Sequence, residues 1–348
     1  MVVLSTRGPF FWCINGCCFN VKKMGGERKM KKHILSLIAF LSLIAGCSTP
    51  YSAYKRISSF EEIEYKYPVK KVYLPKNDVT IAYNDMGSGS KTVIMIHGLG
   101  SYLRAWEKNI EEVSKSARVI AIDLPGYGKS SKDPHSGMMS YYAGVVNELV
   151  SELKLENVIL AGHSMGGQIS ITASLLYPEM VKGMILVAPA GFEKFTKGQK
   201  QWFRDVMTLD GVRLTSTEAI TTNLSSNFYR MPLDADFMIT DRIAMRHAED
   251  FIPYCYAVVQ SVNGMVNEPV LKYLKDIKVP TLILFGKNDN LIPNRFLNPG
   301  PTADIAKVGN TLIANSKLVM VPKCGHFLMF EKPAEFNSEA IQFIKSIQ

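Results

Sequence analysis

The 348-residue chain is 47% hydrophobic and 20% charged, which excludes an intrinsically disordered protein and allows a sizeable buried core. Its formal net charge of +9 would suit a nucleic-acid-binding protein, but residues 1–46 carry seven of the basic side chains against one acidic side chain. Residues 47–348 carry 33 basic and 30 acidic side chains, a net of only +3. We therefore expect no nucleic-acid partner.

The first predicted element is a targeting segment. Met30-Lys31-Lys32-His33 is basic, and the apolar run Ile34–Ile44 that follows is interrupted only by Ser36 and Ser42. This run is too short for a typical membrane-spanning helix and suits the apolar core of a signal peptide. It ends in Ile44-Ala45-Gly46-Cys47, which resembles the lipobox of bacterial lipoproteins.

That resemblance implies that residues 30–46 are a lipoprotein signal peptide and that Cys47 is acylated, for example with palmitate. Residues 47–67 would then be a tether, and the membrane would be a partner through the lipid anchor. The expected location is the cell envelope, at the periplasmic or surface face of the outer membrane. An ordinary secretory signal and an uncleaved anchor helix are the alternatives. We expect residues 1–29 to be a non-native extension, with translation starting at Met30 or Met24.

Strand and helix patterns alternate after the tether. Apolar runs bounded by turn residues predict buried parallel strands, and 3.6-residue periodicity predicts helices between them. The expected fold class is therefore α/β, a mostly parallel sheet flanked by helices. The predicted strands are 71–74 and 79–83, which form an opening hairpin, then 92–96, 118–122, 158–161, 184–187, 282–285 and 318–321, and the predicted helices are 141–153, 166–176 and 333–347.

One interval, residues 192–274, breaks the alternation. It has helical periodicity, many aromatic residues and no convincing buried strand. An interval of this length between two core strands is too long for a loop, so we predict an inserted helical cap. The core domain then comprises residues 68–191 and 275–348.

The sequence Gly162-His163-Ser164-Met165-Gly166 lies between a predicted strand and a predicted helix. A Gly-x-Ser-x-Gly pattern in this context is typical of a nucleophile elbow, in which the turn exposes the serine hydroxyl. Flanking glycines are required because a side chain there would clash with the strand or the helix. Ser164 is therefore the candidate nucleophile.

A serine hydroxyl needs a neighbouring base to accept its proton. The candidate base is His326, which follows the last predicted strand, because the other histidines lie in the signal peptide, the elbow, the cap or early loops. The candidate acid is Asp289, which follows the strand at 282–285 and would orient the imidazole. We expect the aspartates of the cap, Asp241 and Asp250 among them, to be solvated or helix-capping, and we place Asp304 in a loop.

Two backbone N–H groups are expected to stabilise the oxyanion. One belongs to Met165, the residue after the nucleophile, and the other to Leu99 in His97-Gly98-Leu99-Gly100. The triad needs no metal, and we expect neither a metal nor a cofactor.

Together, His97–Gly100, Asp123–Ser130, the Ser164 elbow, Gly286–Pro293 and Gly325-His326 resemble the α/β-hydrolase superfamily over about residues 68–348. The resemblance implies an eight-stranded core, a helical cap and hydrolysis through an acyl-enzyme. Serine at the elbow argues against the dehalogenase-like and epoxide-hydrolase-like members, which use aspartate there. Residues 294–316 are longer than the usual segment between acid and histidine.

The leading functional hypothesis is a lipase-like carboxylesterase acting on a small-molecule ester with an apolar acyl chain. The same residues would also serve carbon–carbon bond hydrolysis of the meta-cleavage-product type, or acyl transfer to an alcohol. A non-catalytic binding lipoprotein is a weaker alternative, because every residue type of the triad is present. The sequence leaves the oligomeric state open.

Overall fold

The computed structural model describes residues 11–14, 17–20 and 54–348. The chain divides into two compact units, Met1–Ala53 and Tyr54–Gln348. The second unit contains all the predicted site residues except Cys47.

The described part of the first unit is a short hairpin in which β1 (Phe11–Ile14) pairs antiparallel with β2 (Cys17–Asn20). The predicted signal peptide at 30–46 and the predicted acylation site Cys47 lie outside the described residues. Among the residues that are described, no helix is long and apolar enough to cross a membrane.

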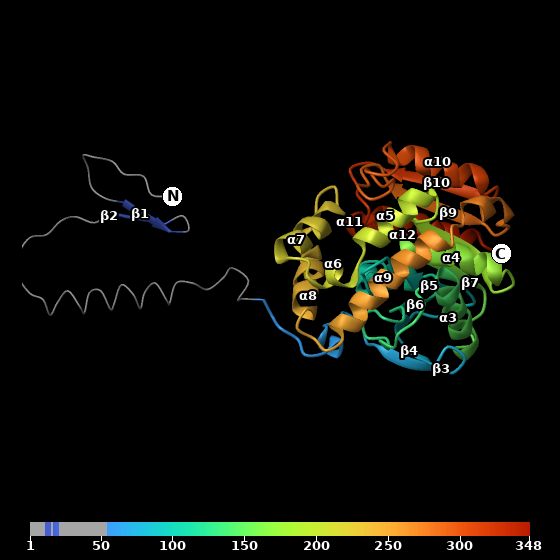
Figure 1. The fold of residues 1–348 in the computed structure, drawn as a ribbon. Helices are drawn as coiled ribbons and strands as arrows, with labels where there is room; N and C mark the ends of the chain where they lie inside the picture. The colour runs from blue at the N-terminus through green and yellow to red at the C-terminus, as the bar shows by residue number, and fades with distance from the viewer. Residues whose placement is uncertain (1–10, 15–16, 21–53) are drawn as a thin grey trace, which may run out of the picture. The chain divides into compact units, whose positions relative to one another are not determined.

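The second unit is built on an eight-stranded sheet, which confirms the predicted α/β fold class. The strand order is β10-β9-β8-β7-β5-β6-β4-β3, and Figure 1 shows the sheet running from blue β3 at the bottom to red β10 at the top. The pairs β3–β4 and β4–β6 are antiparallel, and the other neighbours are parallel. The strands are β3 (Lys70–Leu74), β4 (Val79–Met86), β5 (Thr92–Ile96), β6 (Arg118–Ile122), β7 (Val158–His163), β8 (Val181–Val187), β9 (Thr281–Gly286) and β10 (Ser316–Val321).

The central strands are apolar on both faces because helices cover both sides of the sheet. In β5, Ile94 and Ile96 belong to one core cluster, and Val93 and Met95 belong to the other. This alternation follows from the two-residue period of a strand. The first cluster packs beneath α3 (Met139–Glu152), α4 (Met165–Leu176) and α10 (Thr302–Leu312), and the second beneath α2 (Ile110–Ser114), α11 (Leu328–Glu331) and α12 (Pro333–Ser346).

Helices and short turns make up the chain between β8 and β9 (Figure 1). The long helix α9 packs on the sheet core through residues such as Cys255 and Val258, while Ile220, Ile239 and Ile243 form a small separate cluster. We call this region, residues 192–274, the cap. Its helices are α5 (Lys197–Val206), α6 (Leu209–Arg213), α7 (Thr217–Ser226), α8 (Phe237–Met245) and α9 (Phe251–Asn267), with 3₁₀ helices at Leu233–Ala235 and Leu271–Asp276.

The segment before the sheet is fastened to the cap. Ile57, Phe60 and Ile63 are buried. The Asp250 carboxylate, at the start of α9, accepts hydrogen bonds from the Phe60 N–H at 2.6 Å and the Ser59 hydroxyl at 2.9 Å. The expectation that Asp250 is merely solvated or helix-capping is therefore wrong, because its carboxylate is used to join two distant segments.

A second correction concerns the segment between the predicted acid and the predicted histidine. Residues Thr302–Leu312 form helix α10, so Asp304 lies in the first turn of a helix and not in a loop. Gly309 lies inside this helix, where a Cβ would come within 2.0 Å of the Phe192 ring. The glycine weakens the helical pattern in the sequence, yet the close packing on Phe192 requires it.

Candidate active site

Ser164 is the residue at which β7 ends and α4 begins. Its backbone has φ 53° and ψ −115°, a conformation that is rare and strained for a residue with a side chain. The Ser164 N–H donates to the Val187 carbonyl at 2.9 Å, and its own carbonyl accepts from the N–H groups of Gly167 and Ala190. These hydrogen bonds hold the strained turn in place.

The flanking glycines permit this turn. A Cβ at Gly162 would lie 2.2 Å from the Gly166 carbonyl oxygen, and a Cβ at Gly166 would lie 2.3 Å from the Ile96 carbonyl oxygen. Neither contact is sterically possible, because backbone atoms cannot move aside as a flexible side chain can. The motif spacing thus reflects direct backbone-to-backbone packing of β7, α4 and β5.

The structure brings Asp289 and His326 together. His326 Nδ1 lies 2.8 Å from Asp289 Oδ2, and both residues are buried. Asp289 Oδ1 accepts hydrogen bonds from the N–H groups of Leu291 and Ile292, which orient the carboxylate. Because an ionised carboxylate only accepts, Nδ1 carries the proton and Nε2 is the free acceptor.

Ser164 and His326 line the same cavity. In the described residues, however, no hydrogen bond joins the Ser164 hydroxyl to His326. Such contacts are often long in structures without substrate, so the geometry places the two groups in one site without joining them.

Two backbone N–H groups beside Ser164 have no hydrogen-bond acceptor among the residues that the structure describes. They belong to Leu99 and to Met165, the pair predicted from the sequence. The loop that contains Leu99 lies close to the nucleophile: a Cβ at Gly98 would lie 3.1 Å from the Ser164 Cβ and 2.9 Å from His163 Nδ1. Glycine at this position therefore permits the close approach. Unpaired N–H groups in this position are suited to an oxyanion.

The cap forms hydrogen bonds to the oxyanion loop, His97–Gly100, and the sequence did not indicate this contact. Arg242 of α8 and the Tyr254 hydroxyl of α9 both donate to the Gly100 carbonyl, the latter at 3.1 Å. The Arg242 guanidinium also lies 4.9 Å from the centre of the Tyr254 ring. No motif surrounds Arg242, so only the three-dimensional packing identifies it.

Asp241, the neighbour of Arg242, adds to this connection. Its carboxylate accepts from the Tyr102 hydroxyl and forms a 3.0 Å ion pair with Arg104, two residues that follow the oxyanion loop. The expectation that Asp241 is solvated or helix-capping is therefore wrong. Burial raises the pKa of this carboxyl, while Tyr102 and Arg104 act in the opposite direction.

Two buried histidines support the site from behind. His163 Nε2 donates to the His326 carbonyl at 3.1 Å, and His97 bonds to the Gly98 carbonyl at 2.8 Å and to the Leu124 N–H at 3.1 Å. Burial lowers the pKa of His97 to about 4 and the pKa of His163 well below its ordinary value. Both imidazoles are therefore neutral hydrogen-bonding groups near neutral pH.

A cavity of about 1070 Å³ extends from Ser164 beneath the cap. Most of its lining is apolar and comes from the cap, including Phe203, Met245, Val262 and Met265. This volume is large enough for an extended acyl chain.

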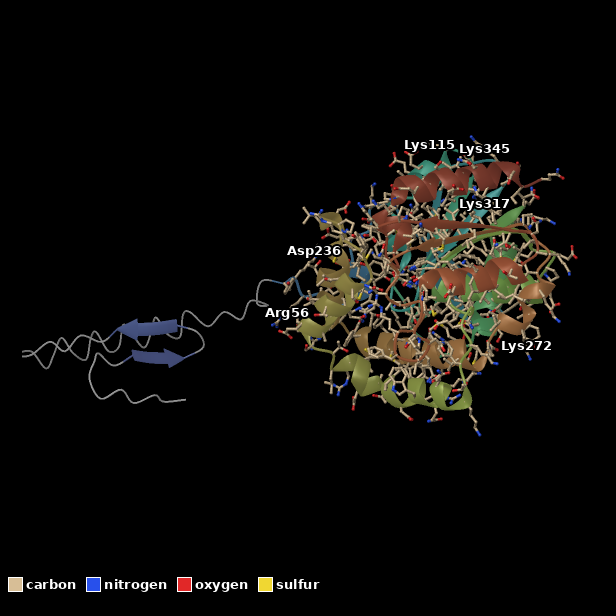
Figure 2. The ribbon with its side chains drawn as sticks, turned by 90° about the horizontal axis from the view of Figure 1, so that it is seen from above. Arg56, Lys115, Asp236, Lys272, Lys317 and Lys345 are labelled. Carbon is tan, nitrogen blue, oxygen red and sulfur yellow. The ribbon has the colours of Figure 1, made fainter. Side chains whose placement is uncertain are left out.

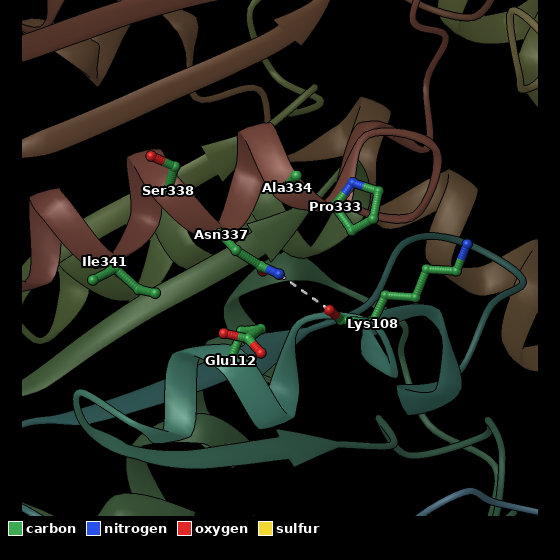
Figure 3. A pocket seen from close by; sticks show the side chains of 7 residues that line it. All are labelled: Lys108, Glu112, Pro333, Ala334, Asn337, Ser338 and Ile341. Atoms are coloured by element: carbon green, nitrogen blue, oxygen red, sulfur yellow. Dashed lines mark hydrogen bonds between the residues drawn. The ribbon is translucent and has the colours of Figure 1, made fainter.

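A smaller hollow of about 590 Å³ lies between α2 and α12, where Asn337 donates to the Lys108 carbonyl, and no histidine lines it (Figure 3).

Within residues 54–348 and the short hairpin, no three His, Cys, Asp or Glu side chains are grouped as metal ligands. Cys255 and Cys324 are both buried free thiols, and burial raises the pKa of Cys255 to about 11.

The sequence is similar to known proteins. A family model described as the alpha/beta hydrolase fold matches residues 91–333. The chain is 28% identical over 282 residues to a 2-hydroxy-6-oxononadienedioate/2-hydroxy-6-oxononatrienedioate hydrolase of Pseudomonas putida. The aligned region covers 77% of this chain and 92% of that protein.

Two solved structures are similar in fold. One is a probable hydrolytic enzyme from Pseudomonas aeruginosa, with a TM-score of 0.72, 24% identity and coverage of 83% of this chain and 98% of that one. The other is an esterase from Exiguobacterium antarcticum, with a TM-score of 0.68, 24% identity and coverage of 80% and 99%. At this level of identity the likeness establishes the fold and not the substrate.

Proposed function

Since the chain belongs to the α/β-hydrolase family and is an enzyme of that fold, we propose that it is a serine hydrolase of carboxylic esters with an apolar acyl chain. The observation that carries the proposal is the buried contact between Asp289 and His326, because His326 lines the same cavity as Ser164. The apolar lining contributed by the cap supports an acyl chain as the group that occupies this cavity.

The mechanism follows from these positions. His326 Nε2 takes the proton of the Ser164 hydroxyl as its oxygen attacks the ester carbonyl, and Asp289 stabilises the resulting imidazolium. The N–H groups of Leu99 and Met165 donate to the oxyanion of the tetrahedral intermediate. His326 then gives its proton to the leaving alcohol, an acyl-enzyme remains on Ser164, and water releases the acid by the same steps.

The test is a panel of 4-nitrophenyl esters from acetate to palmitate. We expect turnover that Ser164→Ala lowers by roughly a thousandfold or more, because the nucleophile is removed. Ser151→Ala, at an exposed serine of α3 that does not line the cavity, is the matched control. Lack of Ser164-dependent turnover of every ester, together with no labelling by a fluorophosphonate probe, would reject the proposal.

Carbon–carbon bond hydrolysis is the second candidate. The observation that favours it is the 28% identity to the Pseudomonas putida hydrolase, whose name gives a dienedioate as its substrate. The same triad would serve this reaction. Turnover of such a dienedioate with no activity on any ester of the panel would replace the first proposal by the second.

We also propose that Cys47 carries a lipid that anchors the enzyme in the cell envelope, at the outer membrane. The basic segment, the apolar run and the Ala45-Gly46-Cys47 sequence support this. Incorporation of labelled palmitate into the wild-type protein, with none in Cys47→Ser, is expected. Equal labelling of both, or a mature protein that retains residues 30–46, would contradict it.

A further inference from the structure

The cavity above Ser164 is apolar, but its charged groups are almost all of one sign. Among the described residues that line it, Glu193 is the single acidic residue. The basic residues are Lys194, Lys200, Arg242, Arg246, Lys272 and Lys275. Six basic side chains against one acidic side chain give the lining a net formal charge of +5.

This charge is concentrated in the cavity and is not a property of the whole unit. Residues 54–348 carry 33 basic and 30 acidic side chains, a net of +3. Subtracting the lining residues leaves 27 basic and 29 acidic side chains, a net of −2. The positive charge therefore collects around the candidate active site, while the rest of the unit is slightly negative.

The lining cations are not neutralised by the protein. Within residues 54–348, no salt bridge joins any of the six to a carboxylate. Glu193 is engaged elsewhere, since it accepts from the Asn294 N–H at 2.8 Å and the Asn298 side chain at 3.1 Å. Burial raises the pKa of Glu193, which further weakens it as a counter-charge.

Several of these cations lie where the cavity opens to solvent. Lys194, Lys272 and Lys275 line the cavity and are also exposed, so they stand at its mouth. Trp202 and Leu291, each 39% exposed, also line the cavity, and we call these five exposed lining residues the mouth. The opening therefore combines apolar surface with ammonium groups that have no carboxylate partner, although Lys272 lies over the Tyr273 ring at 4.6 Å from its centre.

We infer that the substrate is an anionic amphiphile, an ester whose acyl chain fills the apolar cavity and whose phosphate or carboxylate group lies among the lysines at the mouth. The inference rests on the proposed ester hydrolysis and names the class of ester. Like charges in a cleft with apolar walls reinforce one another and attract ligands of opposite charge. A small free anion should bind poorly, because it would leave the apolar lining of the cavity exposed to water.

The first experiment measures binding without catalysis, on the full chain carrying Ser164→Ala. Decyl phosphate and decanol share a tail and differ in charge. The protein also carries Trp12→Phe, so that Trp106 and Trp202 are its two tryptophans. Trp106 is fully buried, and Trp202, which lines the cavity, reports binding through its fluorescence. We expect decyl phosphate to bind at least tenfold more tightly than decanol, and less tightly as salt is added. Equal affinities, or inorganic phosphate binding as tightly as decyl phosphate, would overturn the inference.

The second experiment assigns the effect to the mouth. Lys272→Gln/Lys275→Gln should lower the preference for decyl phosphate over decanol by about tenfold, which corresponds to 1.4 kcal/mol. The matched control, Lys115→Gln/Lys345→Gln, removes the same charge from two exposed lysines that do not line the cavity. Figure 2 shows both at the top of the unit, away from Lys272 at the lower right. An equal loss in both double variants would indicate a general effect of net charge and overturn the assignment.

The third experiment links binding to turnover. 1-Decanoylglycerol and its 3-phosphate carry the same acyl group, and we expect kcat/KM to be at least tenfold higher for the phosphate ester. A preference for the neutral ester would overturn the inference while leaving ester hydrolysis intact. If neither ester is cleaved in a Ser164-dependent manner, the 4-nitrophenyl ester panel and the fluorophosphonate probe decide whether ester hydrolysis fails. Decyl phosphate binding to Ser164→Ala still decides the charge preference.

Discussion

Gly98 is the residue on which the spacing between the oxyanion loop and the nucleophile depends. A methyl group there would lie within 3.1 Å of both the His163 ring and the Ser164 Cβ. The loop would have to move outward by several tenths of an ångström, and hydrogen bonds to an oxyanion weaken quickly with such displacements. The lack of a side chain at this position is therefore part of the site.

We predict that Gly98→Ala lowers kcat by about 10- to 100-fold, with a smaller change in KM, because the Leu99 N–H is displaced from the transition state. Steady-state kinetics on one 4-nitrophenyl ester measures both. Gly300→Ala is the control, since a Cβ there meets nothing within 4 Å. An unchanged kcat in Gly98→Ala would contradict the assignment of Leu99 to the oxyanion hole.

At the scale of single elements, α9 depends on a crossing of unusually close backbones. A Cβ at Gly264 of α9 would lie 2.1 Å from the Gly137 carbonyl oxygen in the loop before α3. This contact fastens the longest helix of the cap to the core. Gly198 of α5 has open space around it, so the two helical glycines differ in what they permit.

Gly264→Ala is therefore expected to lower the free energy of unfolding by about 2–3 kcal/mol through forced separation of the backbones. Gly198→Ala should raise it by about 0.5–1 kcal/mol, because alanine is the better helix former. Urea unfolding of both variants beside the wild type measures the difference. An unchanged or raised free energy of unfolding in Gly264→Ala would mean that the crossing is not rigid.

The elements also show what sequence patterns reveal and what they miss. Ser164, Asp289 and His326 each follow a predicted buried strand, and the carboxyl ends of parallel strands meet at one edge of a sheet, so their meeting was predictable. Helix α10 was not predicted, because Gly309 interrupts its pattern for the sake of the Phe192 contact. Arg242 was missed because a side chain that bonds to a backbone carbonyl leaves no periodic trace.

At the scale of the whole molecule, buried titratable groups set the pH dependence of stability, and His97, His163 and Asp123 are among them. Burial lowers the pKa of His97 to about 4, and it also lowers the pKa of His163. It raises the pKa of Asp123 to about 6. Between pH 6.5 and 4 the unfolded chain binds protons on the histidines that the folded chain does not, so stability falls on acidification. Asp123 acts in the opposite direction from pH 6 downward, because its carboxyl protonates more readily in the folded state.

His97 alone is expected to remove about 3 kcal/mol of stability between pH 6.5 and 4, and Asp123 to offset a similar amount. The lowered pKa values of His163 and His135 act in the same direction as that of His97, and the raised pKa values of Glu193 and Asp241 act in the direction of Asp123. The free energy of unfolding, measured at half-unit intervals over this range, should therefore lose about 3 kcal/mol less on acidification in His97→Gln than in the wild type. A steeper fall in the variant would show that His97 is already protonated in the folded protein.

The hydrogen bonds from Arg242 and Tyr254 to the Gly100 carbonyl carry a thermodynamic consequence. If α8 and α9 hold the Leu99 N–H in place, a ligand that uses that N–H must in turn hold α8 and α9, because coupling between two sites is reciprocal. A covalent phosphonate on Ser164 should therefore slow amide hydrogen exchange in α8, and this protection should be weaker in Arg242→Gln/Tyr254→Phe than in the wild type. Binding in the oxyanion hole and opening of the cap are then coupled equilibria, and hydrogen exchange measures the free energy of that coupling.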